Sequence, residues 1–380
     1  PSEIAGAEEI DSPIKYLAVV DIAYQWALGR PGYALGRIME MLGAEGTGKT
    51  TNFYSLIRLF FDAGGVGAMV ETELALSKEQ MKMILGPHYR DFEGLFNQPK
   101  SFEKGINMLI KYLQMFKKID PKNEIPKILV YDTLAGAGVE AVYSEADFDS
   151  GKMAQGGIAA KARILAGSID VIKTLAAETN TLVIFGNQAK QKIFTGAASL
   201  VRRAELDTIG GQGGKSLDFF TTYWDYLKRG SVYKNSSGEK RGFYVSHTFK
   251  KNKLRAPYRK FEMIVDFDAG VRFDKPTVEV LTNSGVCGIK KLKGGYYVCE
   301  ERGISVNGEM KCGELYEAIH SPEHIGWFAS KFDILYPPGA DQVIYPVSWK
   351  GRVPDINPGE SGRADAGTYE PEDGEEDETS

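Results

Sequence analysis

Residues 43–51 read Gly-Ala-Glu-Gly-Thr-Gly-Lys-Thr-Thr, which has the spacing G-x-x-x-x-G-K-T of a phosphate-binding loop. The glycines let the backbone curl so that successive N–H groups point at phosphate oxygens, with the positive end of a helix behind them. Lys49 is expected to reach the β- and γ-phosphates, and the Thr50 hydroxyl to take a place on Mg²⁺. The predicted nucleotide-binding residues are Gly43, Gly46, Gly48, Lys49, Thr50 and Thr51. The alternative is a glycine-rich turn that binds no ligand.

A strand before this loop and a helix after it are needed to aim it, and the sequence predicts both. Residues 37–42, Arg-Ile-Met-Glu-Met-Leu, are typical of a short buried strand. The helix begins near Lys49, and its apolar residues follow the i, i+3, i+4, i+7, i+8 spacing of one helix face. These residues are Phe53, Leu56, Ile57, Phe60 and Phe61. The order strand, turn, helix favours a ligand-binding loop over a simple turn.

A second strand is predicted to bring a carboxylate to the same edge of the sheet. The apolar segment 127–131 runs directly into Asp132. Because ligands of parallel sheets bind at the carboxyl ends of the strands, Asp132 is predicted to hold Mg²⁺ through water, together with Thr50. The alternative is that Asp132 caps the helix that follows. Residues 66–73 form another short strand that ends in carboxylates.

A further strand, residues 181–188, ends in two amides, Asn187 and Gln188, where a γ-phosphate could be sensed. From Ala189 to Lys215 the hydrophobic periodicity is lost, and the segment closes with Gly210-Gly211-Gln212-Gly213-Gly214. A long, basic, glycine-rich loop inside a compact domain is usually functional or disordered. Its position after the sensing strand indicates a ligand loop whose order depends on ATP. A mobile surface loop is the alternative.

The alternation of strands and helices predicts the fold class, an α/β core with a mostly parallel sheet and helices on both faces. A length of 380 residues indicates about two or three structural units. Beyond Asp274, residues 294–298 are typical of a strand and residues 322–335 of a helix. They predict a small C-terminal α/β lobe.

The charge of the chain is unevenly distributed. Ten acidic residues and one arginine from Asp355 onward carry −9, which leaves +4 on residues 1–354 of a chain with net charge −5. Residues 354–380 are rich in proline, glycine and acid and cannot bury enough apolar surface to fold, so we expect a disordered acidic tail. The tail either serves solubility or regulates, by competing with phosphates for a basic groove.

The remaining composition points to a soluble cytoplasmic protein. The sequence has no run of 18 apolar residues and does not open with a signal-peptide pattern, so no membrane partner is expected. Cys287, Cys299 and Cys312 are odd in number and widely spaced, which fits reduced thiols. A zinc site with His320 and His324 is an alternative, although the cysteines lack the C-x-x-C spacing of structural sites.

The order of these motifs resembles that of the RecA-type homologous recombinases, including their bacteriophage relatives of the UvsX type. The resemblance rests on the lead-in 28–40, Glu71–Leu76, Asn97–Pro99, Tyr131–Ala135, Gly186–Gln188 and Lys251–Tyr258. The phosphate loop is common to many ATPases, whereas this combination in order is specific. The resemblance covers residues 28–273 and implies a RecA-like P-loop ATPase core.

The resemblance also implies roles for single residues. Glu73 falls on the family's catalytic glutamate, which orients and activates the attacking water. Gln188 falls on the γ-phosphate sensor, and Lys251 and Lys253 on the basic pair that completes the ATP site of the neighbouring subunit. With Lys49, they form the predicted catalytic set. The implied cofactors are ATP and Mg²⁺. The implied location is the cytoplasm of a bacterial or phage-infected cell.

Two loops are implied to contact DNA, since such loops need cations for phosphates and glycines for close approach. The first lies near residues 149–157 and the helix after them. The second is the basic glycine-rich loop. The predicted DNA-binding residues are Gly156, Gly157, Lys161, Arg163, Lys190, Lys192, Arg202, Arg203, Gly213, Gly214 and Lys215.

The implied function is a DNA-dependent ATPase that forms filaments on single-stranded DNA and pairs it with homologous double-stranded DNA. A ring helicase of the same fold is one alternative. Another is an ATP-gated protein that coats single-stranded DNA, with binding as its function. Where the family commonly has an acidic residue and an aromatic ring near adenine, this chain has Ser77 and Gln80, which leaves nucleotide selectivity open.

The predicted organisation has four parts. Residues 1–27 form an N-terminal segment and possible oligomerisation arm, residues 28–273 the ATPase and DNA-binding core, residues 274–353 the lobe, and residues 354–380 the tail. The N-terminal segment is short for the family's arm. Its apolar residues could still supply a strand to a neighbouring subunit, and these are Ile14, Tyr16, Leu17, Val19 and Val20.

Overall fold

The computed structural model describes residues 14–346, with gaps at 20, 74–76, 141–156, 192–208, 213, 236, 286, 305–310, 322, 333 and 338–341. The predicted acidic tail lies outside the described residues.

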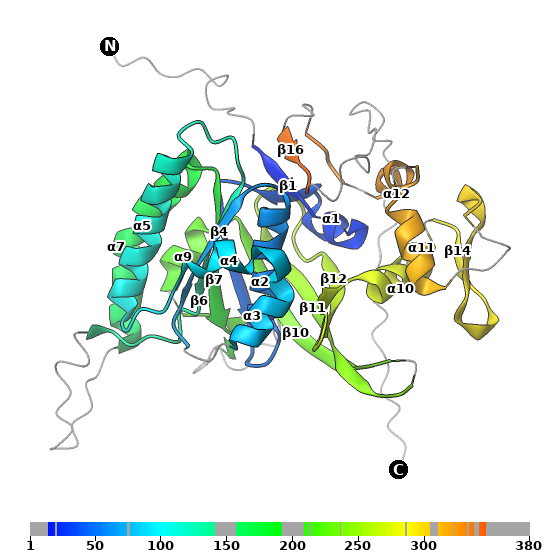
Figure 1. Ribbon diagram of the computed structural model, residues 1–380, viewed down its shortest axis with the longest axis horizontal. Helices are drawn as coiled ribbons and strands as arrows, with labels where there is room; N and C mark the ends of the chain where they lie inside the picture. Colours follow the sequence, from blue (N-terminus) through cyan, green and yellow to red (C-terminus); the bar gives the residue numbers. More distant parts are fainter. Residues whose placement is uncertain are drawn as a thin grey trace, which may run out of the picture.

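A sheet of nine strands forms the centre of the molecule, in the order β13-β12-β11-β10-β3-β7-β6-β4-β5 (Figure 1). The strands are β3 Ile38–Gly43, β4 Val66–Glu71, β5 Phe96–Asn97, β6 Lys127–Asp132, β7 Thr181–Gln188, β10 Tyr223–Lys234, β11 Lys240–Asn252, β12 Lys260–Asp266 and β13 Gly270–Arg272. From β10 to β5 each neighbouring pair is parallel. From β10 to β13 the pairs are antiparallel. The predicted mostly parallel α/β sheet is confirmed, with an antiparallel extension on one side.

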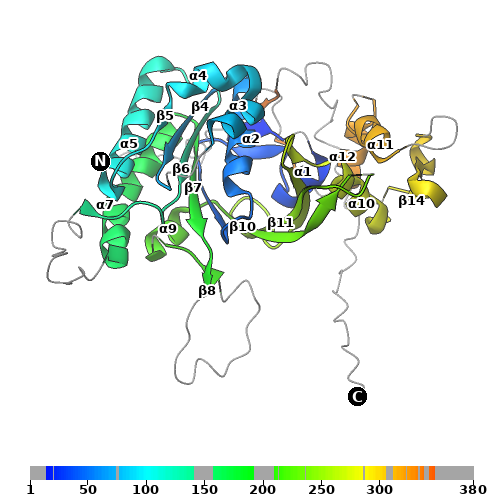
Figure 2. The same cartoon turned by 60° about the horizontal axis from the view of Figure 1, so that its bottom comes forward.

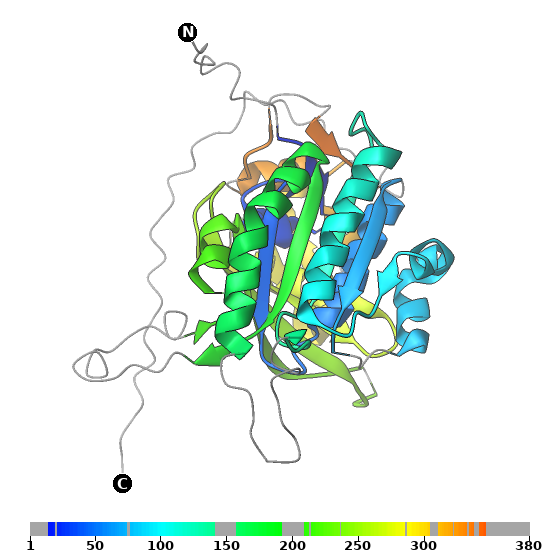
Figure 3. The same ribbon diagram turned by 90° about the vertical axis from the view of Figure 1, so that its left-hand side faces the viewer.

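Helices cover both faces of the parallel strands. The helices of the core are α1 Ile22–Leu28, α2 Lys49–Asp62, α3 Lys78–Leu85, α4 Tyr89–Glu93, α5 Phe102–Ile119, α7 Gly157–Glu178 and α9 Gly214–Phe220. Helices α5 and α7 lie across one face (Figure 3), and their apolar side chains form one buried cluster with Leu129, Val183 and Phe185. Alternate strand residues, Val130 and Ile184, belong to the cluster of α2. This period of two is that of strands buried on both faces.

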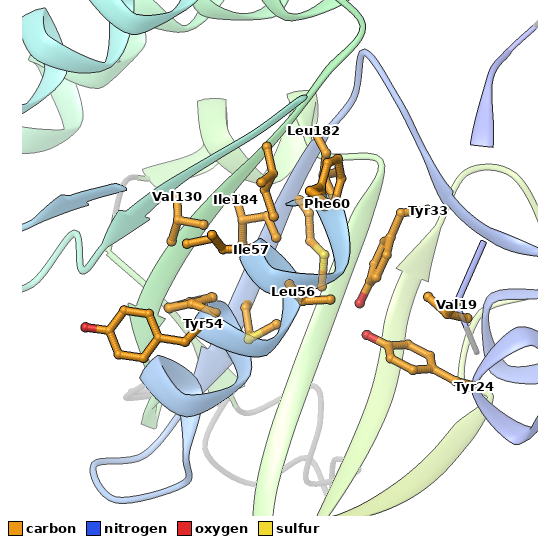
Figure 4. Close-up of a cluster of buried hydrophobic side chains, with 14 of the residues drawn as sticks. Val19, Tyr24, Tyr33, Tyr54, Leu56, Ile57, Phe60, Val130, Leu182 and Ile184 are labelled. Carbon is orange, nitrogen blue, oxygen red and sulfur yellow. The ribbon is translucent and has the colours of Figure 1, made fainter. Parts of the chain in front are cut away.

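The cluster beneath α2 fixes the helix that follows the phosphate loop. Ile57 and Phe60 are fully buried and belong to the same cluster as Val130 and Ile184 (Figure 4). Burial of one such side chain contributes about 1.5–3 kcal/mol. Packing on the sheet therefore determines where the amino end of α2 points.

The described part of the N-terminal segment, from residue 14 onward, packs against its own chain. Residues Tyr16–Ala18 form β1, which pairs with β2, Gly32–Ala34, and with β16, Val343–Ile344. Tyr16 and Leu17 are buried within their own subunit in this structure. Their role as a strand for a neighbouring subunit stays a prediction. Helix α1 then begins at its cap, Asp21, and packs on the core. The predicted boundary between the N-terminal segment and the core at residue 28 stays a prediction.

The C-terminal lobe is a small α/β unit, as predicted. It comprises α10 Asp274–Ser284, β14 Ile289–Lys291, β15 Tyr297–Cys299, α11 Cys312–Ile319 and α12 Ile325–Lys331. Short 3₁₀ turns occupy Gly86–His88, Lys293–Gly295 and Glu300–Arg302. Ile22 of α1 belongs to the hydrophobic cluster of the lobe, which joins the lobe to the core.

The lobe offers no support for the zinc alternative. Cys287 and Cys299 are buried, and the Cys299 thiol donates to the backbone oxygen of Cys287. His320 accepts from the N–H of Ile22 at 3.1 Å through Nε2, and its Nδ1 lies 2.7 Å from the backbone oxygen of Tyr316. Both ring nitrogens are therefore engaged. Within the described part of the chain, no group of three His, Cys, Asp or Glu side chains is placed to hold a metal ion.

Among the described residues, no helix is both long and apolar enough to cross a membrane.

Candidate nucleotide-binding active site

The predicted phosphate loop lies between β3 and α2, at the carboxyl edge of the parallel strands. Gly46 and Gly48 have φ of 70° and 81°, which favours glycine. A Cβ on Gly48 would lie 2.8 Å from Val265 Cγ2, so the loop also needs glycine there for space. Lys49 is 7% exposed, and its Nζ donates to the backbone oxygens of Gly43 and Ala44, both at 2.9 Å. The lysine is thus folded inside the curl that would receive a phosphate.

The burial of Lys49 favours the binding of an anion beside its ammonium group. Burial lowers the pKa of its ammonium, and the carboxylates of Asp132, Glu73 and Glu45 act in the opposite direction. A desolvated cation is most strongly stabilised by a nearby negative group. A triphosphate would supply that charge.

Asp132 and Thr50 meet although 82 residues separate them. The Thr50 hydroxyl donates to Asp132 Oδ2 at 2.7 Å. The two residues meet because β6 ends and α2 begins at this edge of the sheet. Burial is the main cause that raises the pKa of Asp132 to about 7, with the negative charge of Glu73 adding to it and the Thr50 hydrogen bond opposing it. No described residue donates a hydrogen bond to Asp132 Oδ1, which is buried.

This pair fits a magnesium ion on its chemistry. Mg²⁺ prefers oxygen ligands, keeps several waters and is usually held by one or two carboxylates with substrate phosphates. A buried carboxylate oxygen with no protein donor, next to a hydroxyl, offers such a position. The structure thereby brings together both residues that the sequence assigns to the metal.

Glu73 is held at the same edge by neighbours that the sequence did not predict. The Thr133 hydroxyl donates to Glu73 Oε1 at 2.8 Å. The backbone N–H of Glu73 donates to Glu71 Oε1 at 2.7 Å, and Gln98 Nε2 donates to Glu71 Oε2 at 2.7 Å. Glu71 is fully buried, so its two oxygens anchor the segment that carries Glu73. The carboxylates at the end of the apolar segment 66–73 were the sequence signal for this anchor.

Gln188 lies beside the first residue of the phosphate loop. In the register of β3 and β7, Gln188 is the partner of Gly43. The backbone N–H of Ala189 donates to the Gly43 oxygen at 3.1 Å. Asn187 points elsewhere, because its side chain bonds to Glu40 and to the backbone of Gln212. Of the two amides at this strand end, only Gln188 remains a candidate sensor.

Lys251 and Lys253 do not lie at their own phosphate loop. Lys251 donates to the backbone oxygens of Asp218 and Phe219, and Lys253 donates to that of Phe219 at 2.7 Å. In the sheet, Lys251 pairs with Trp224, whereas Leu227 is the residue that pairs with Gly43. The two ammonium groups therefore lie against the carboxyl end of α9. Burial lowers the pKa of both, and Lys253 further lowers that of Lys251.

Apart from Lys161, the predicted DNA-binding residues fall into three groups. Arg163, Lys190, Gly214 and Lys215 are exposed, and β7 runs directly into β8, Lys190–Gln191 (Figure 2). Gly157 is the first residue of α7. The residues Gly156, Lys192, Arg202, Arg203 and Gly213 lie outside the described residues.

Lys161 differs from those other cations predicted to contact DNA that the structure describes. It is 8% exposed, and its Nζ donates to the backbone oxygens of Leu134 and Ala135 at 3.0 and 3.1 Å. The helical position that seemed to offer it to DNA turns it instead toward the segment after β6. In this structure Lys161 supports the loop that follows Asp132.

Two further contacts at the loop were not predicted. Arg229 Nη1 donates to the Gly46 oxygen at 3.2 Å while its guanidinium lies 4.0 Å from the centre of the Phe243 ring. Gln80 Nε2 donates to Thr51 Oγ1 at 3.2 Å. Ser77 caps α3. The long β10–β11 hairpin and α3 thus contact the ends of the nucleotide loop.

The chain is similar in sequence to a known protein family and to several of its members. A family model described as the RecA N-terminal domain matches residues 4–272. The chain is 29% identical to Protein RecA of Borrelia duttonii over 266 residues, which are 69% of this chain and 66% of that protein, just under two thirds. It is 25% identical to Protein RecA of Thermotoga maritima over 324 residues, 85% of this chain and 83% of that protein. For Protein RecA of Thermus aquaticus the identity is 26% over 300 residues, 79% and 80% of the two chains.

Proposed function

Given that the chain belongs to the RecA family, we propose that it is a DNA-dependent ATPase that assembles on single-stranded DNA as a helical filament and exchanges strands with homologous duplexes. The observation that carries the proposal is the convergence of Lys49, the Thr50–Asp132 pair, Glu73 and Gln188 at one edge of the sheet. Four separate strand ends contribute to it. A shared edge of this kind is where a triphosphate is bound and cleaved.

In the proposed reaction each residue has one task. Lys49 offsets the charge of the β- and γ-phosphates. Thr50 and Asp132 would hold Mg²⁺, which when bound neutralises further phosphate charge. Glu73, oriented by the Thr133 hydroxyl, accepts a proton from the water that attacks the γ-phosphate, and ADP and inorganic phosphate are released. Gln188 donates an amide hydrogen bond to the γ-phosphate.

The placement of Lys251 and Lys253 supports an ATP site shared between subunits. Both ammonium groups lie on exposed backbone oxygens at the end of α9, at a different level of the sheet from the phosphate loop. A cation hydrogen-bonded to neutral carbonyl groups can exchange these bonds for a stronger, charge-assisted contact with a neighbour's phosphate. In a head-to-tail assembly, such a pair would act as an arginine finger does.

The exposed cations support DNA as the partner. Arg163, Lys190 and Lys215 belong to the segments predicted as DNA loops and lie in the solvent. Lys190 follows Gln188 by two residues, which gives a short covalent path from nucleotide to DNA. The hydrogen-bonded position of Glu73 favours turnover over a role as a coating protein alone.

Electron microscopy with single-stranded DNA and a slowly hydrolysed ATP analogue tests the proposal. An extended helical filament, with joint molecules formed when homologous duplex DNA and ATP are added, is the expected result. Closed rings would indicate the helicase alternative. Filaments without joint molecules would leave DNA coating as the function.

A further inference from the structure

The side chain of Asn187 uses all of its hydrogen-bonding capacity inside the protein. Its Nδ2 donates to Glu40 Oε1 at 2.7 Å and to the Gln212 oxygen at 2.6 Å. Its Oδ1 accepts from the N–H groups of Gln188 and Gln212, both at 3.0 Å. An amide has two donors and two acceptor sites, so every one is occupied. A flipped amide would set its NH₂ against two N–H donors and is excluded.

These bonds join two segments that lie 25 residues apart in the chain. Asn187 is on β7, one residue before the candidate sensor Gln188. Gln212 closes the basic loop, two residues after β9, Ile209–Gly210, which pairs with β8. Both N–H and C=O of Gln212 bind the same side chain, which is the way a strand neighbour would be held. The closing end of the loop is thereby attached to the sensor strand.

Gly211 is required for this attachment. A Cβ at Gly211 would lie 2.2 Å from Asn187 Nδ2 and 2.6 Å from Glu40 Oε1. Only a residue without a side chain allows the loop backbone to approach the two polar groups so closely. The close approach accounts for one glycine of the run that the sequence analysis singled out.

We propose that Asn187 is a positioning residue that fastens the end of the basic loop to the strand carrying Gln188, and that Glu40 fixes the orientation of the Asn187 amide. A shift of Gln188 on nucleotide contact would then be transmitted to the loop that contacts DNA, and a shift of the loop to Gln188. This connection rests on the proposed function of the two ends, whereas the attachment itself rests on the contacts described above.

The environment of Glu40 makes the attachment sensitive to pH. Glu40 is buried on β3 and is faced by Asn187 of β7, Trp224 of β10, Asp218 of α9 and Lys251 of β11. Burial chiefly, then the charge of Asp218, raises the pKa of Glu40 to about 8, against the hydrogen bonds of Asn187 and Trp224 and the charge of Lys251. At neutral pH the carboxyl is mostly protonated. As pH rises through about 8 it becomes a buried anion, which burial destabilises although the Asn187 hydrogen bond favours it.

Three full-length variants test the attachment. Asn187→Leu removes all four hydrogen bonds at similar volume. Glu40→Gln keeps a neutral acceptor for Asn187 at every pH. Thr179→Val is the matched control, because Thr179 is a fully buried polar residue just before the opposite end of β7 and bonds to Leu175 and Thr181.

The first readout is hydrogen–deuterium exchange of the segment 209–212, corrected for intrinsic rates. Asn187→Leu should speed exchange there at least about tenfold, since a buried donor and acceptor lose their partner, while Thr179→Val should not. In the unaltered protein protection should decrease as pH rises from about 5 toward 8 and then level off, and in Glu40→Gln it should not change with pH. Equal exchange in Asn187→Leu and the unaltered protein, or equal loss in Thr179→Val, would overturn the proposal.

The second readout is the ratio of ATP turnover with and without single-stranded DNA. Asn187→Leu should reduce the ratio about tenfold relative to Thr179→Val. An unchanged ratio would overturn the coupling role. If the unaltered protein shows no DNA stimulation, the proposed function fails, and the exchange measurement still decides whether the attachment exists.

Discussion

Two buried aspartates, Asp132 at the nucleotide edge and Asp21 at the junction of core and lobe, share a residue type and a raised pKa but differ in their partners. Asp21 accepts from the Tyr24 N–H at 2.8 Å and from the Thr277 hydroxyl at 2.5 Å, and the Tyr316 side chain bonds to it as well. Asp132 has one protein donor, Thr50, and a buried oxygen with none among the described residues.

The difference shows what distinguishes a carboxylate open to a ligand from a carboxylate that holds helices together. Burial raises the pKa of both carboxyl groups, so a raised pKa alone identifies neither. A carboxylate whose oxygens are all used by α1, α10 and α11 fastens those elements. A carboxylate with an unused oxygen at a strand end is open to an ion or a water.

Exchange of either aspartate for asparagine gives the strongest test of this comparison. Asp132→Asn should lower ATP turnover at least about 100-fold, because the metal loses its carboxylate, with little change in melting temperature. Asp21→Asn should lower the free energy of unfolding by about 1–3 kcal/mol, since an NH₂ replaces an acceptor, with turnover per folded molecule unchanged. Turnover and calorimetric unfolding of both variants decide it. Equal effects of the two substitutions on turnover would break the distinction.

Mixing two inactive chains tests whether the nucleotide edge is completed by a neighbour. A chain with Lys251→Ala and Lys253→Ala and a chain with Glu73→Gln should each lack turnover. In equal mixtures about a quarter of the interfaces combine an intact Glu73 with intact lysines, so roughly that share of activity should return. Steady-state ATPase across mixing ratios measures it. The in-trans role is excluded when co-assembled mixtures stay inactive.

The pH dependence of stability tests the structural role of Asp21. Burial raises the folded pKa of Asp21 from its ordinary value of 3.8 to about 6, so the stabilisation present below pH 4 is lost as pH rises through 6. At about 1.4 kcal/mol per pKa unit, this amounts to at most about 3 kcal/mol. Denaturant unfolding between pH 4 and 8 should show that loss, and Asp21→Asn should lack it. A variant with the same pH profile as the unaltered protein would contradict the assignment.

Lys161 and Lys215 allow a similar comparison between a buried cation with structural contacts and an exposed cation proposed to contact DNA. Lys161→Met should cost about 1–3 kcal/mol of stability, because the Leu134 and Ala135 oxygens lose their donor, and should leave the salt dependence of DNA binding unchanged. Lys215→Met, at an exposed position, should leave stability within about 0.5 kcal/mol and reduce the salt slope by about one. Binding isotherms across a salt series, with unfolding curves, are the measurements. A reduced slope for Lys161→Met would restore it as a DNA contact.

Removal of residues 355–380 should give the smallest effect. The truncation takes away −9 and leaves +4, so affinity for double-stranded DNA should rise at low salt. The gain should shrink as salt screens the charges over about 8 Å at physiological ionic strength. Isotherms of intact and truncated chains that coincide at low salt would reduce the tail to a solubility device.

Much of the fold was predictable because its signals are local. The predicted strands at 37–42, 127–133 and 181–188 appear as β3, β6 and β7 within one or two residues. Apolar runs that end in glycine, acid or amide mark such strands well. Thr50 and Asp132 could be paired from sequence because the carboxyl ends of parallel strands share one edge.

The contacts that sequence could not predict depend on register and on distant segments. Tyr16 pairs with Val343, and no local pattern indicates a partner more than 300 residues away. Lys161 is buried on α7. Which side chains of α7 face the solvent depends on the residue at which that helix begins. Asn187 and Gln188 are adjacent amides, but the alternation of a strand sends them to opposite sides.

Turnover of ATP by the unaltered chain and by Glu73→Gln, with and without single-stranded DNA, tests the central claim most directly. We predict that DNA raises turnover at least about tenfold in the unaltered chain. In Glu73→Gln the DNA-stimulated rate should fall about 10²–10⁴-fold while nucleotide binding persists. Turnover that ignores DNA, or that survives in Glu73→Gln, would contradict the account.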